Sequence, residues 1–566
     1  MDRGLDEHGP AVTLRERAAR WLPFTVPALF LAVFFVLPAG TIVLTGLRPE
    51  GRLDLGTLPR VLSDPGTLRV AWFTLWQAAA STALTLVLGL PGAYALTRLR
   101  FRGRAALRAA VMVPFVLPTV VVGSAFLALL GPRSPVNAAS VALLGEAAPT
   151  LDLRRTVTAI LLAHVFFNYA VVVRSVGGLW EHLDPRLEDA ARTLGASRWR
   201  VFREVSWPLL RPAVASSAAI VFLFTFTSFG VVLILGGPGR ATIEVEIYRA
   251  TVQLLNLPLA SVLALLQLAA VTAALVAYGR LQRRVTRQPL RSAGSTARPP
   301  RTVGERLFLA VNLAVIVLLV LAPLLVLVER SLAVDGGYGF AHYRALFSDQ
   351  RSTVLAVAPL EAIRNSVVFG LAAALVALVV GGCAATAASR PGRAGRVLDR
   401  ALMLPLGTSA ATVGFGFLLA LARPPLDLRG SLLLVPAAQA LIATPFVVRT
   451  LLPVLRSIDQ RLRDAAATLG ATPRRVWREV DLPIVGRAVL AAVGFSFAIA
   501  VGEFGATVFL ARGQTPTMPV AIFRLLGRPG VANFGQAMAM STILMFVTAS
   551  AVAVLDRLRV GQVGRF

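Results

Sequence analysis

The sequence predicts an all-α polytopic membrane protein with about twelve transmembrane helices, arranged as two parallel halves of six. Hydrophobic residues make up 56% of the 566-residue chain and charged residues only 15%, and apolar runs of about 20 residues recur throughout. Clusters of arginine separate some of these runs, as expected for loops on the inner side of a bilayer. A polar stretch at 184–196 returns 275 positions later at 459–471, which indicates an internal duplication.

Composition excludes several classes of function. All 57 basic residues are arginine, and a Walker A P-loop requires a lysine, so this chain cannot hold an ATPase site of that form. The single cysteine, Cys383, cannot form an intrachain disulfide, and the four histidines show no metal-ligand spacing. We therefore expect neither a metal nor a cofactor. The net charge of +28 is attributed to arginine-rich loops rather than to nucleic-acid binding.

The first half is expected to occupy residues 23–279, after a cytoplasmic N-terminal segment at 1–22. The apolar run at 24–47 follows arginines, as in a signal peptide, but it is too long for a signal-peptide core and is interpreted as a retained first span. Five further apolar runs complete this half, at 70–96, 106–131, 156–178, 209–236 and 257–279.

A linker rich in Arg, Ser, Gly and Pro at 280–306 is predicted to separate the halves. The second half is expected at 307–556, and a short tail follows at 557–566. Its six apolar runs lie at 307–329, 364–389, 399–421, 431–454, 486–510 and 535–555. The halves differ in length mainly before their fourth runs, where the loop at 131–155 is long, because insertions belong in loops rather than in spans.

The arginines also predict the orientation. With a cytoplasmic N-terminus, the dense basic loops at 98–104 and 390–400 both fall on the cytoplasmic side, as the positive-inside rule requires. Both copies of the polar repeat, the linker and the two chain termini then also lie in the cytoplasm. The expected location is the plasma or inner membrane of a prokaryote, which the chain crosses many times.

Each copy of the repeat is predicted to form a helix, a tight break and a second short helix. Asp184 and Asp459 are suitable helix caps, and Gly195 and Gly470 stand where a glycine ends the first helix. A pair of amphipathic helices lying on the membrane is the alternative interpretation. Such helices need only an apolar face and not a duplicated rigid elbow, so we favour a surface that docks another rigid protein.

The motif Asp-Ala-Ala-x-Thr-Leu-Gly-Ala occurs in both copies, each time followed by Arg-Glu-Val-x-x-Pro, and residues 184–214 and 459–489 agree at about 18 of 31 positions. This pattern resembles the cytoplasmic loop of binding-protein-dependent ABC importer permeases. The resemblance covers nearly the whole chain and is closest to the branch whose two halves are fused in one polypeptide, as in thiamine and ferric-iron permeases. Segments at 160–168, 228–233 and 241–248 favour the thiamine type.

The resemblance implies a type I ABC importer-like permease fold, with coupling loops at 184–208 and 459–483 that dock to an ATPase subunit, expected to be a homodimer. The implied coupling residues are, in the first loop, Glu188, Asp189, Ala190, Ala191, Gly195 and Pro208, and in the second, Asp464, Ala465, Ala466, Gly470 and Pro483. Arg463 replaces the leading glutamate in the second copy, so the second loop is expected to dock differently or to contribute less.

The resemblance also implies the role of the chain in transport. An extracytoplasmic solute-binding protein would deliver the solute, expected to be thiamine or a related cation, with ferric iron as the alternative. The chain would catalyse no reaction of its own. It would alternate between inward-open and outward-open states within the lipid bilayer while the ATPase hydrolyses ATP.

The candidate translocation path consists of His164, Asn168, Ser228, Phe229, Glu503 and Phe504. Glu503 is an acid deep in an apolar run, and such residues normally face a bundle interior or a water-filled path. Aromatic faces attract a desolvated cation, which would suit Phe229 and Phe504. A hydrogen-bonding role in the structure is an equal alternative for Glu503, and hydrogen bonding between helices is the favoured role of His164 and Asn168.

Two other functional classes compete with a binding-protein-dependent permease. A secondary transporter also has duplicated halves, but its repeats are commonly inverted or lack a recurring cytoplasmic elbow, whereas halves of six spans lie parallel. A membrane enzyme would need an acid–base, nucleophile or metal constellation near the interface, and the sequence shows none.

Overall fold

The computed structural model describes residues 14–48, 52, 54, 56–132, 134–145, 148–283, 297–335, 337–348, 354–390, 392–421, 424 and 426–559. Parts of three predicted segments lie outside the described residues. They are residues 1–13 of the N-terminal segment, 284–296 of the linker and 560–566 of the tail.

The described part of the first half is built from helices, three of which contain π-helical turns. In chain order they are α1 (Leu14–Leu31), η1 (Ala32–Val36), α2 (Leu37–Leu47), α3 (Thr57–Ser63), α4 (Pro65–Arg98), α5 (Arg104–Met112), η2 (Val113–Val116), α6 (Thr119–Leu130), α7 (Pro135–Leu144), α8 (Val157–His182), α9 (Pro185–Thr193), α10 (Arg198–Val201), η3 (Phe202–Ser206), α11 (Trp207–Phe226), α12 (Gly230–Leu235), α13 (Ile243–Tyr248), η4 (Arg249–Gln253) and α14 (Leu257–Arg283).

The described part of the second half repeats this order and adds one small antiparallel hairpin, in which Ala333 pairs with Tyr338. Its elements are α15 (Val303–Ile316), η5 (Val317–Leu321), α16 (Ala322–Leu332), β1 (Ala333–Val334), β2 (Gly337–Tyr338), α17 (Ala341–Leu346), α18 (Pro359–Ser389), α19 (Arg393–Leu402), η6 (Pro405–Gly407), α20 (Ala410–Ala420), η7 (Leu428–Gly430), α21 (Leu434–Ser457), α22 (Gln460–Thr468), α23 (Pro473–Val476), η8 (Trp477–Asp481), α24 (Leu482–Gly502), α25 (Thr507–Leu510), α26 (Met518–Leu526) and α27 (Val531–Arg559).

Eleven helices among the described residues are long and apolar enough to cross a membrane, and α20 is a shorter apolar helix of the same kind. This result confirms the predicted class of all-α polytopic membrane protein. It also shows that the spans predicted as single helices at 106–131 and 399–421 are wrong in detail. Each is two helices joined by a 3-10 turn, α5 and α6 in the first half and α19 and α20 in the second.

Proline explains both breaks. Pro118 immediately precedes α6, and Pro405 opens the turn between α19 and α20. Leu117, before Pro118, is extended with ψ of 142°, as proline favours in the residue that precedes it. Leu404, before Pro405, keeps helical backbone, so at that break proline acts through its missing N–H. The predicted spans at 209–236 and 486–510 are also broken, because α11 ends at Phe226 and α24 at Gly502, before the short helices α12 and α25.

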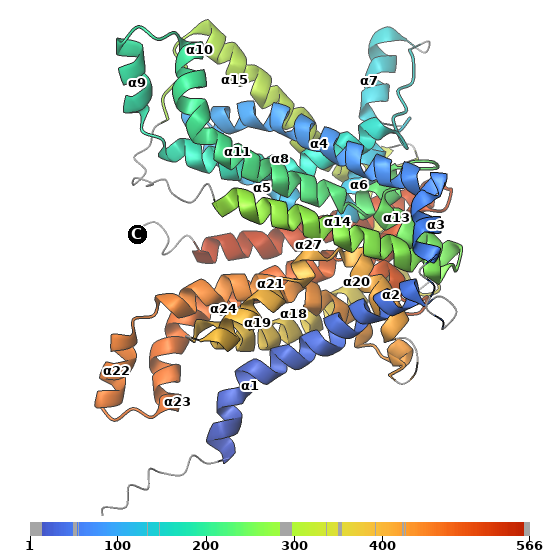
Figure 1. Cartoon of the computed structure of the whole chain (residues 1–566). Helices are drawn as coiled ribbons and strands as arrows, with labels where there is room; N and C mark the ends of the chain where they lie inside the picture. The colour runs from blue at the N-terminus through green and yellow to red at the C-terminus, as the bar shows by residue number, and fades with distance from the viewer. Residues whose placement is uncertain are drawn as a thin grey trace, which may run out of the picture.

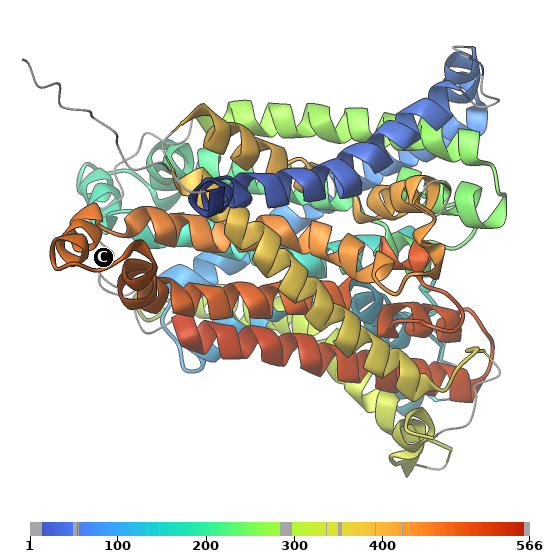
Figure 2. The same ribbon diagram turned by 90° about the horizontal axis from the view of Figure 1, so that it is seen from below.

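The two copies of the polar repeat project from the same end of the molecule. Figure 1 shows α9 and α10 above and α22 and α23 below at the left-hand end, each beyond the long helices of its own half. The view from below in Figure 2 places both pairs at that end again. This arrangement is the one expected for two halves in parallel orientation.

The first helices are exchanged between the halves. Helices α1 and α2 pack against α18 and α20 of the second half, where the rings of Phe34 and Phe417 stack with centroids 5.8 Å apart. In the same way α15 packs against α4 of the first half, where Phe308 meets Tyr94 edge to face at 5.8 Å. The halves that are continuous in sequence are therefore interlocked in space.

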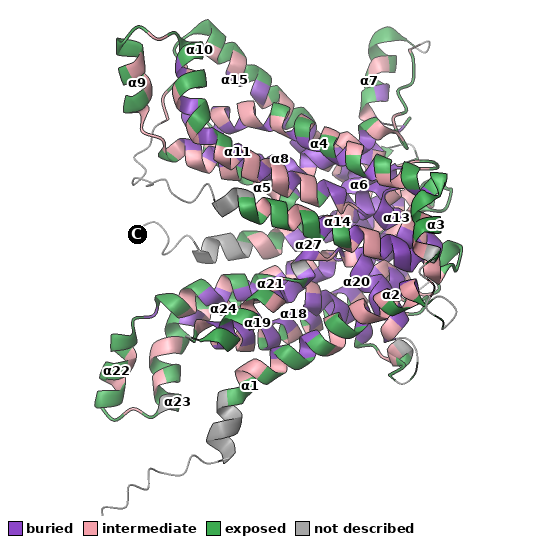
Figure 3. Ribbon diagram, in the orientation of Figure 1, coloured by how far each residue is buried: buried purple, intermediate pink, exposed green. Residues whose placement is uncertain are grey.

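The main hydrophobic core crosses the boundary between the halves and lies away from the elbows. It includes Phe126 and Phe166 from the first half and Phe415 and Phe504 from the second, all almost completely buried. Figure 3 shows buried residues concentrated around α6, α13, α20 and α27, whereas α9 and α22 are exposed or half-buried. The halves are therefore packed together at the end opposite the elbows.

Candidate functional site

The first elbow, defined here as residues 184–208, owes its shape to local hydrogen bonds. The Asp184 carboxylate accepts a hydrogen bond from the Arg186 N–H at 3.0 Å, which caps the start of α9. Gly195 ends the helix with φ of 86°, and the Ala196 N–H donates back to the Ala191 carbonyl at 3.1 Å. Only glycine adopts this left-handed backbone without strain. The next helix starts at Ser197, whose hydroxyl accepts from the Arg200 N–H at 3.3 Å.

The second elbow, residues 459–483, has the same construction. Asp459 caps α22 by accepting from the Arg461 N–H, again at 3.0 Å. Gly470 has φ of 81°, and the Ala471 N–H donates to the Ala466 carbonyl at 3.0 Å. The predicted helix, glycine break and second helix are therefore present in both copies. Their backbones are closely alike despite the substitution at position 463.

Both elbows expose apolar side chains at equivalent positions. Leu194 is 89% exposed and its counterpart Leu469 is 88% exposed, while Leu187 and Leu462 are 52% and 50% exposed. Asp189 and Asp464, which carry the shared motif, are exposed as well. Large apolar side chains so fully exposed at a tip beyond the spans are typical of a surface that another protein covers. The proline of each motif, Pro208 or Pro483, lies in the first turn of the following long helix.

Glu188 points away from this exposed surface and toward the body of the protein. Its carboxylate accepts a hydrogen bond from the Ser206 hydroxyl at 2.9 Å and lies 3.3 Å from the guanidinium of Arg98 at the end of α4. Only 22% of the Glu188 side chain and 7% of that of Arg98 are exposed. Glu188 therefore braces α9 against α4 and against the turn that leads into α11.

Arg463 makes the equivalent brace in the second elbow with the charges reversed. Its Nε donates to the Asp481 carboxylate at 2.8 Å. Positions 463 and 481 correspond to 188 and 206 by the same offset of 275. The replacement of glutamate by arginine is thus matched by the replacement of Ser206 by Asp481. This pairing gives a structural reason for the departure from the motif, and differential docking of the second loop stays a prediction.

A second pair of equivalent positions shows the same reversal. Glu181, at the end of α8, accepts two hydrogen bonds from Arg108 at 2.9 and 2.8 Å and lies 3.3 Å from Arg104. Its counterpart Arg456, at the end of α21, donates to the Ala388 carbonyl at 3.1 Å. The base of each elbow is therefore held by a hydrogen-bonded charged residue, an acid in the first half and an arginine in the second.

The first elbow is also joined to the chain between the halves. Arg298 pairs with residues 98–100 as a short parallel bridge, with hydrogen bonds of 3.1 Å to the Arg98 carbonyl and 2.9 Å from the Arg100 N–H. Glu305 at the start of α15 lies 2.7 Å from Arg298 and 3.7 Å from Arg198 of α10. The hydrogen-bonded Glu305 carboxylate raises the pKa of Arg298 above its usual value. This contact links the first elbow to the second half.

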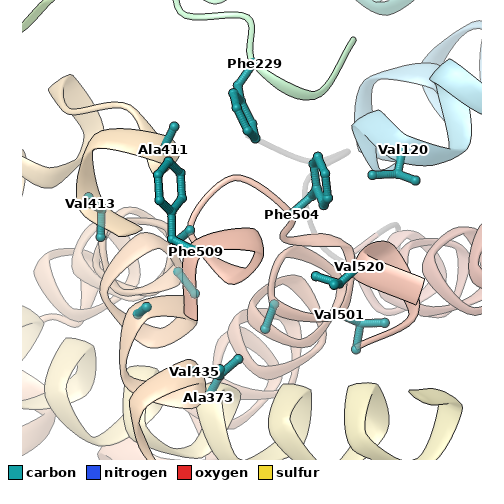
Figure 4. Close-up of a cluster of buried hydrophobic side chains, with 14 of the residues drawn as sticks. Val120, Phe229, Ala373, Ala411, Val413, Val435, Val501, Phe504, Phe509 and Val520 are labelled. Carbon is teal, nitrogen blue, oxygen red and sulfur yellow. The ribbon is translucent and has the colours of Figure 1, made fainter. Parts of the chain in front are cut away.

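Between the halves, aromatic rings from both sides meet in one cluster. Phe229 stacks on Phe504 with ring centroids 5.6 Å apart, so these two predicted path residues do lie together. Figure 4 shows them facing each other, with Phe509 beside them and Val120 and Ala411 at the edge. Both rings are buried in this conformation. The cluster therefore closes the junction between the halves.

Glu503 precedes Phe504 but has its oxygens engaged nearby. Oε1 accepts from the Ala506 N–H at 2.8 Å, and Oε2 accepts from the Thr507 N–H at 3.0 Å and from the Thr507 hydroxyl. The carboxylate thus caps α25 across the break after α24. These contacts match the alternative of a structural role, and the predicted place of Glu503 on the path stays a prediction.

His164 ties three segments together. Its Nδ1 lies 3.0 Å from the Ser81 hydroxyl of α4, and its Nε2 lies 2.8 Å from the Ser228 hydroxyl in the break after α11. These are the interhelical hydrogen bonds that the sequence favoured for this residue. The Asn168 amide instead donates to the His164 carbonyl of its own helix at 2.9 Å. His164 and Ser228 are brought together, whereas among the described residues the Asn168 side chain makes its hydrogen bond within its own helix.

The structure adds a buried acid that the sequence prediction did not include. Glu244 on α13 is completely buried, and its Oε2 accepts from the Ser409 hydroxyl of the other half at 2.7 Å. Oε1 has no hydrogen-bond partner within the described residues, although the amide of Gln267 lies beside it. The available signal was an acid within an otherwise apolar segment. Its partner Ser409, 165 residues away, could not be read from the sequence.

Comparison with known proteins identifies the family. The model of the family described as binding-protein-dependent transport system inner membrane component matches residues 85–287 and 377–560, once in each half. The thiamine transport system permease protein ThiP of Brucella abortus (strain 2308) is 28% identical over 547 residues, which cover 94% of this chain and 96% of that protein. ThiP of Escherichia coli (strain K12) is 28% identical over 482 residues, which cover 82% and 85%.

A relative named for a different solute, sulfate, matches over a shorter length. The sulfate transport system permease protein CysT of Escherichia coli (strain K12) is 32% identical over 264 residues, which cover 46% of this chain and 91% of that protein. The family matches include both elbows and together span more than half of the chain, so they confirm the resemblance expected from the repeated motif. The chain is a fused two-half permease that belongs to the family of binding-protein-dependent transport system inner membrane components.

Proposed function

We propose that the chain is the transmembrane subunit of an ATP-driven ABC importer that carries thiamine, or a related organic cation, into the cytoplasm. The observation that carries this proposal is the pair of equivalent elbows, which present matched exposed leucines and aspartates at one end of two parallel halves. Two copies of one docking surface suit a partner that is itself a symmetric dimer. The family assignment supports an ABC ATPase subunit as that partner.

The braces give the elbows a mechanical role. A movement imposed on α9 passes through Glu188 to Arg98 at the end of α4, and through Ser206 into α11. In the second half, Arg463 passes it through Asp481 into α24. Packed elements with specific polar contacts move as units rather than deforming. The closing and opening of the ATPase dimer therefore moves the two halves relative to each other.

The conformation described above corresponds to one end of that cycle. With both elbows placed in the cytoplasm by the positive-inside rule, the packed junction at Phe229 and Phe504 lies toward the outer end. The path is then closed to the outside, where the solute-binding protein delivers its solute. Separation of the two rings opens it in the alternate state.

The solute assignment rests on the relatives and on the chemistry of the junction. Relatives that match nearly the whole chain are thiamine permeases by their printed names. Thiamine carries a thiazolium ring, and aromatic faces attract such a delocalised cation. Phe229 and Phe504 present these faces to each other where the halves meet. Ferric iron is the alternative solute.

The test is reconstitution of the chain in proteoliposomes with an ABC ATPase and a solute-binding protein from the same organism. Uptake of labelled thiamine is expected only with ATP and with all three proteins present. Ferric iron and sulfate are measured in parallel. Selective uptake of either ion in place of thiamine would refute the solute assignment, and solute uptake without any ATPase would refute the importer mechanism.

A further inference from the structure

Five aromatic rings, contributed by both halves, form a closed group at the junction. Besides the Phe229–Phe504 stack, Tyr248 meets Phe229 at 5.8 Å and Phe509 at 5.5 Å, and Phe523 meets Phe504 at 5.5 Å between ring centroids. Two come from the first half and three from the second. Such a group of rings around one point is the arrangement that recognises quaternary and heteroaromatic cations in proteins. In this conformation the five rings pack directly against one another.

Glu244 supplies the charge that complements these rings. It lies one helical turn before Tyr248 on α13, so the two side chains share a face of that helix. Its Oε2 is held by the Ser409 hydroxyl across the junction, and the amide of Gln267 is the other polar group beside its carboxylate among the described residues. A completely buried acid with only neutral partners is costly, because apolar surroundings disfavour a charge that no opposite charge balances, and this cost favours a functional role.

The duplication shows that the fold itself does not require this acid. Residues 247–249 align with 522–524 by the offset of 275, and by the same offset the counterpart of Glu244 is Pro519. Proline is equally well placed at the start of α26. The buried charge is therefore a feature added on one side of an otherwise repeated junction.

We propose that Glu244 and the five rings form the binding site for an organic cation of delocalised charge, which enters when the halves separate. This inference rests on the proposed function for the separation itself. Parting of the halves removes the Ser409 hydroxyl from Glu244 and pulls Phe229 and Tyr248 away from the rings of the second half. The exposed carboxylate then pairs with the cation while the rings pack on its faces. Glu503 does not take this role, because its oxygens bind backbone N–H groups.

The site would select against a hard metal ion. A ferric ion prefers several oxygen ligands at close range, whereas the four phenylalanine rings provide none and the oxygen donors of the proposed site are the Glu244 carboxylate and the Tyr248 phenol. An organic cation instead gains from each ring face that it covers. The aromatic lining of the proposed site therefore favours a thiamine-like organic cation over a ferric ion.

The test uses the full-length protein in lipid nanodiscs, without ATPase or binding protein. Thermal unfolding is followed during titration with thiamine, with choline chloride, and with a neutral isostere of thiamine that has a thiophene in place of the thiazolium. The wild type is expected to be stabilised by at least one of the two cations and not by the neutral isostere. Glu244→Gln is expected to bind that cation at least tenfold more weakly.

Two further variants control for misfolding and for general loss of charge. Glu244→Asp should restore part of the cation response, and Glu246→Gln, which changes an acid paired with Arg249 on the same helix, should retain the full response. A wild type that responds to neither cation would overturn the proposal, and so would a Glu244→Gln protein that responds as the wild type does. Tyr248→Leu should weaken binding of the cation severalfold while leaving the melting temperature without ligand within a few degrees.

The outcome is separable from that of the proposed function. Failure of thiamine uptake in proteoliposomes, with cation binding retained in nanodiscs, would reject the thiamine importer and leave an organic-cation site. Normal uptake together with unchanged uptake in Glu244→Gln would reject the site and leave the importer intact.

Discussion

The two elbows share their backbone and their exposed leucines and aspartates but have opposite charges on their inner side. Outside, Leu194 and Leu469 occupy equivalent positions and are equally exposed. Inside, the brace of the first elbow is an acid that accepts from serine, and the brace of the second is an arginine that pairs with Asp481. The inner contacts could change because both members of each pair lie within one half. The exposed leucines and aspartates kept their identity, as expected if both copies meet the same partner.

Arg463, which replaces the motif glutamate in the second elbow, lies on the inner side of that elbow. A motif position that differs between copies suggested a weaker second elbow. Its side chain faces Asp481 rather than the docking surface, so the difference concerns how the elbow is held. The predictions below test this distinction between outer docking positions and inner bracing positions.

The largest effect is expected from changes on the outer surface. Leu194→Asp and Leu469→Asp should each weaken binding of the ATPase about thirtyfold, because burying one leucine contributes about 2 kcal/mol. Stability of the isolated permease should not change, since both side chains are exposed. Pull-down affinity and melting temperature give the two readouts. Equal losses for both copies would support equivalent docking, and a loss confined to Leu194 would show that the second elbow contributes less.

The next effect concerns the reversed brace. Arg463→Glu places two acids together and should destabilise the second elbow by about 2 kcal/mol, because Asp481 is left without its partner. Adding Asp481→Ser recreates the glutamate–serine pair of the first elbow. The double variant should therefore recover most of the solute uptake that the single variant loses. Transport by the single and double variants is measured at equal membrane expression. No recovery in the double variant would refute the interchangeability of the braces.

A smaller and symmetric effect is expected at the glycines. Gly195→Ala and Gly470→Ala should each cost about 1 kcal/mol, because both residues have positive φ. An added Cβ meets nothing within 4 Å at either position, so the effect comes from the backbone alone. Hydrogen exchange of the elbow amides should rise equally in the two variants. A clear difference between the copies would show that their backbones are not equivalent.

The smallest effect is expected where the elbows differ in their surroundings. Glu305→Gln removes the ion pairs that link α15 to Arg298 and Arg198, and should destabilise the first elbow by about 0.5 kcal/mol because its partner on the elbow, Arg198, is 72% exposed and lies 3.7 Å away. Hydrogen exchange should increase in α10 and not in α23. An equal increase in both elbows would show that this contact acts on the whole protein.

Sequence alone determined the features that depend on near neighbours in the chain. The caps at Asp184 and Asp459 bind N–H groups two residues away, and Gly195 and Gly470 end helices through bonds within the same turn. Such contacts are fixed by local backbone geometry, so a short motif suffices to predict them. The long apolar runs and the repeat likewise identified the membrane class and the family. The proline breaks were also local signals, but the continuous apolar pattern concealed them.

Only the tertiary structure decided which charges are partnered and where the halves meet. Glu188 and Arg98 are 90 residues apart in the chain, and Glu244 and Ser409 are 165 apart. The exchange of α1 and α15 between the halves has no local signal at all, because an apolar helix can pack against many surfaces equally well. A buried charge is tolerated only beside a suitable partner, and that partner is set by packing. The fold therefore determines whether a polar residue braces an elbow, caps a helix or faces the junction.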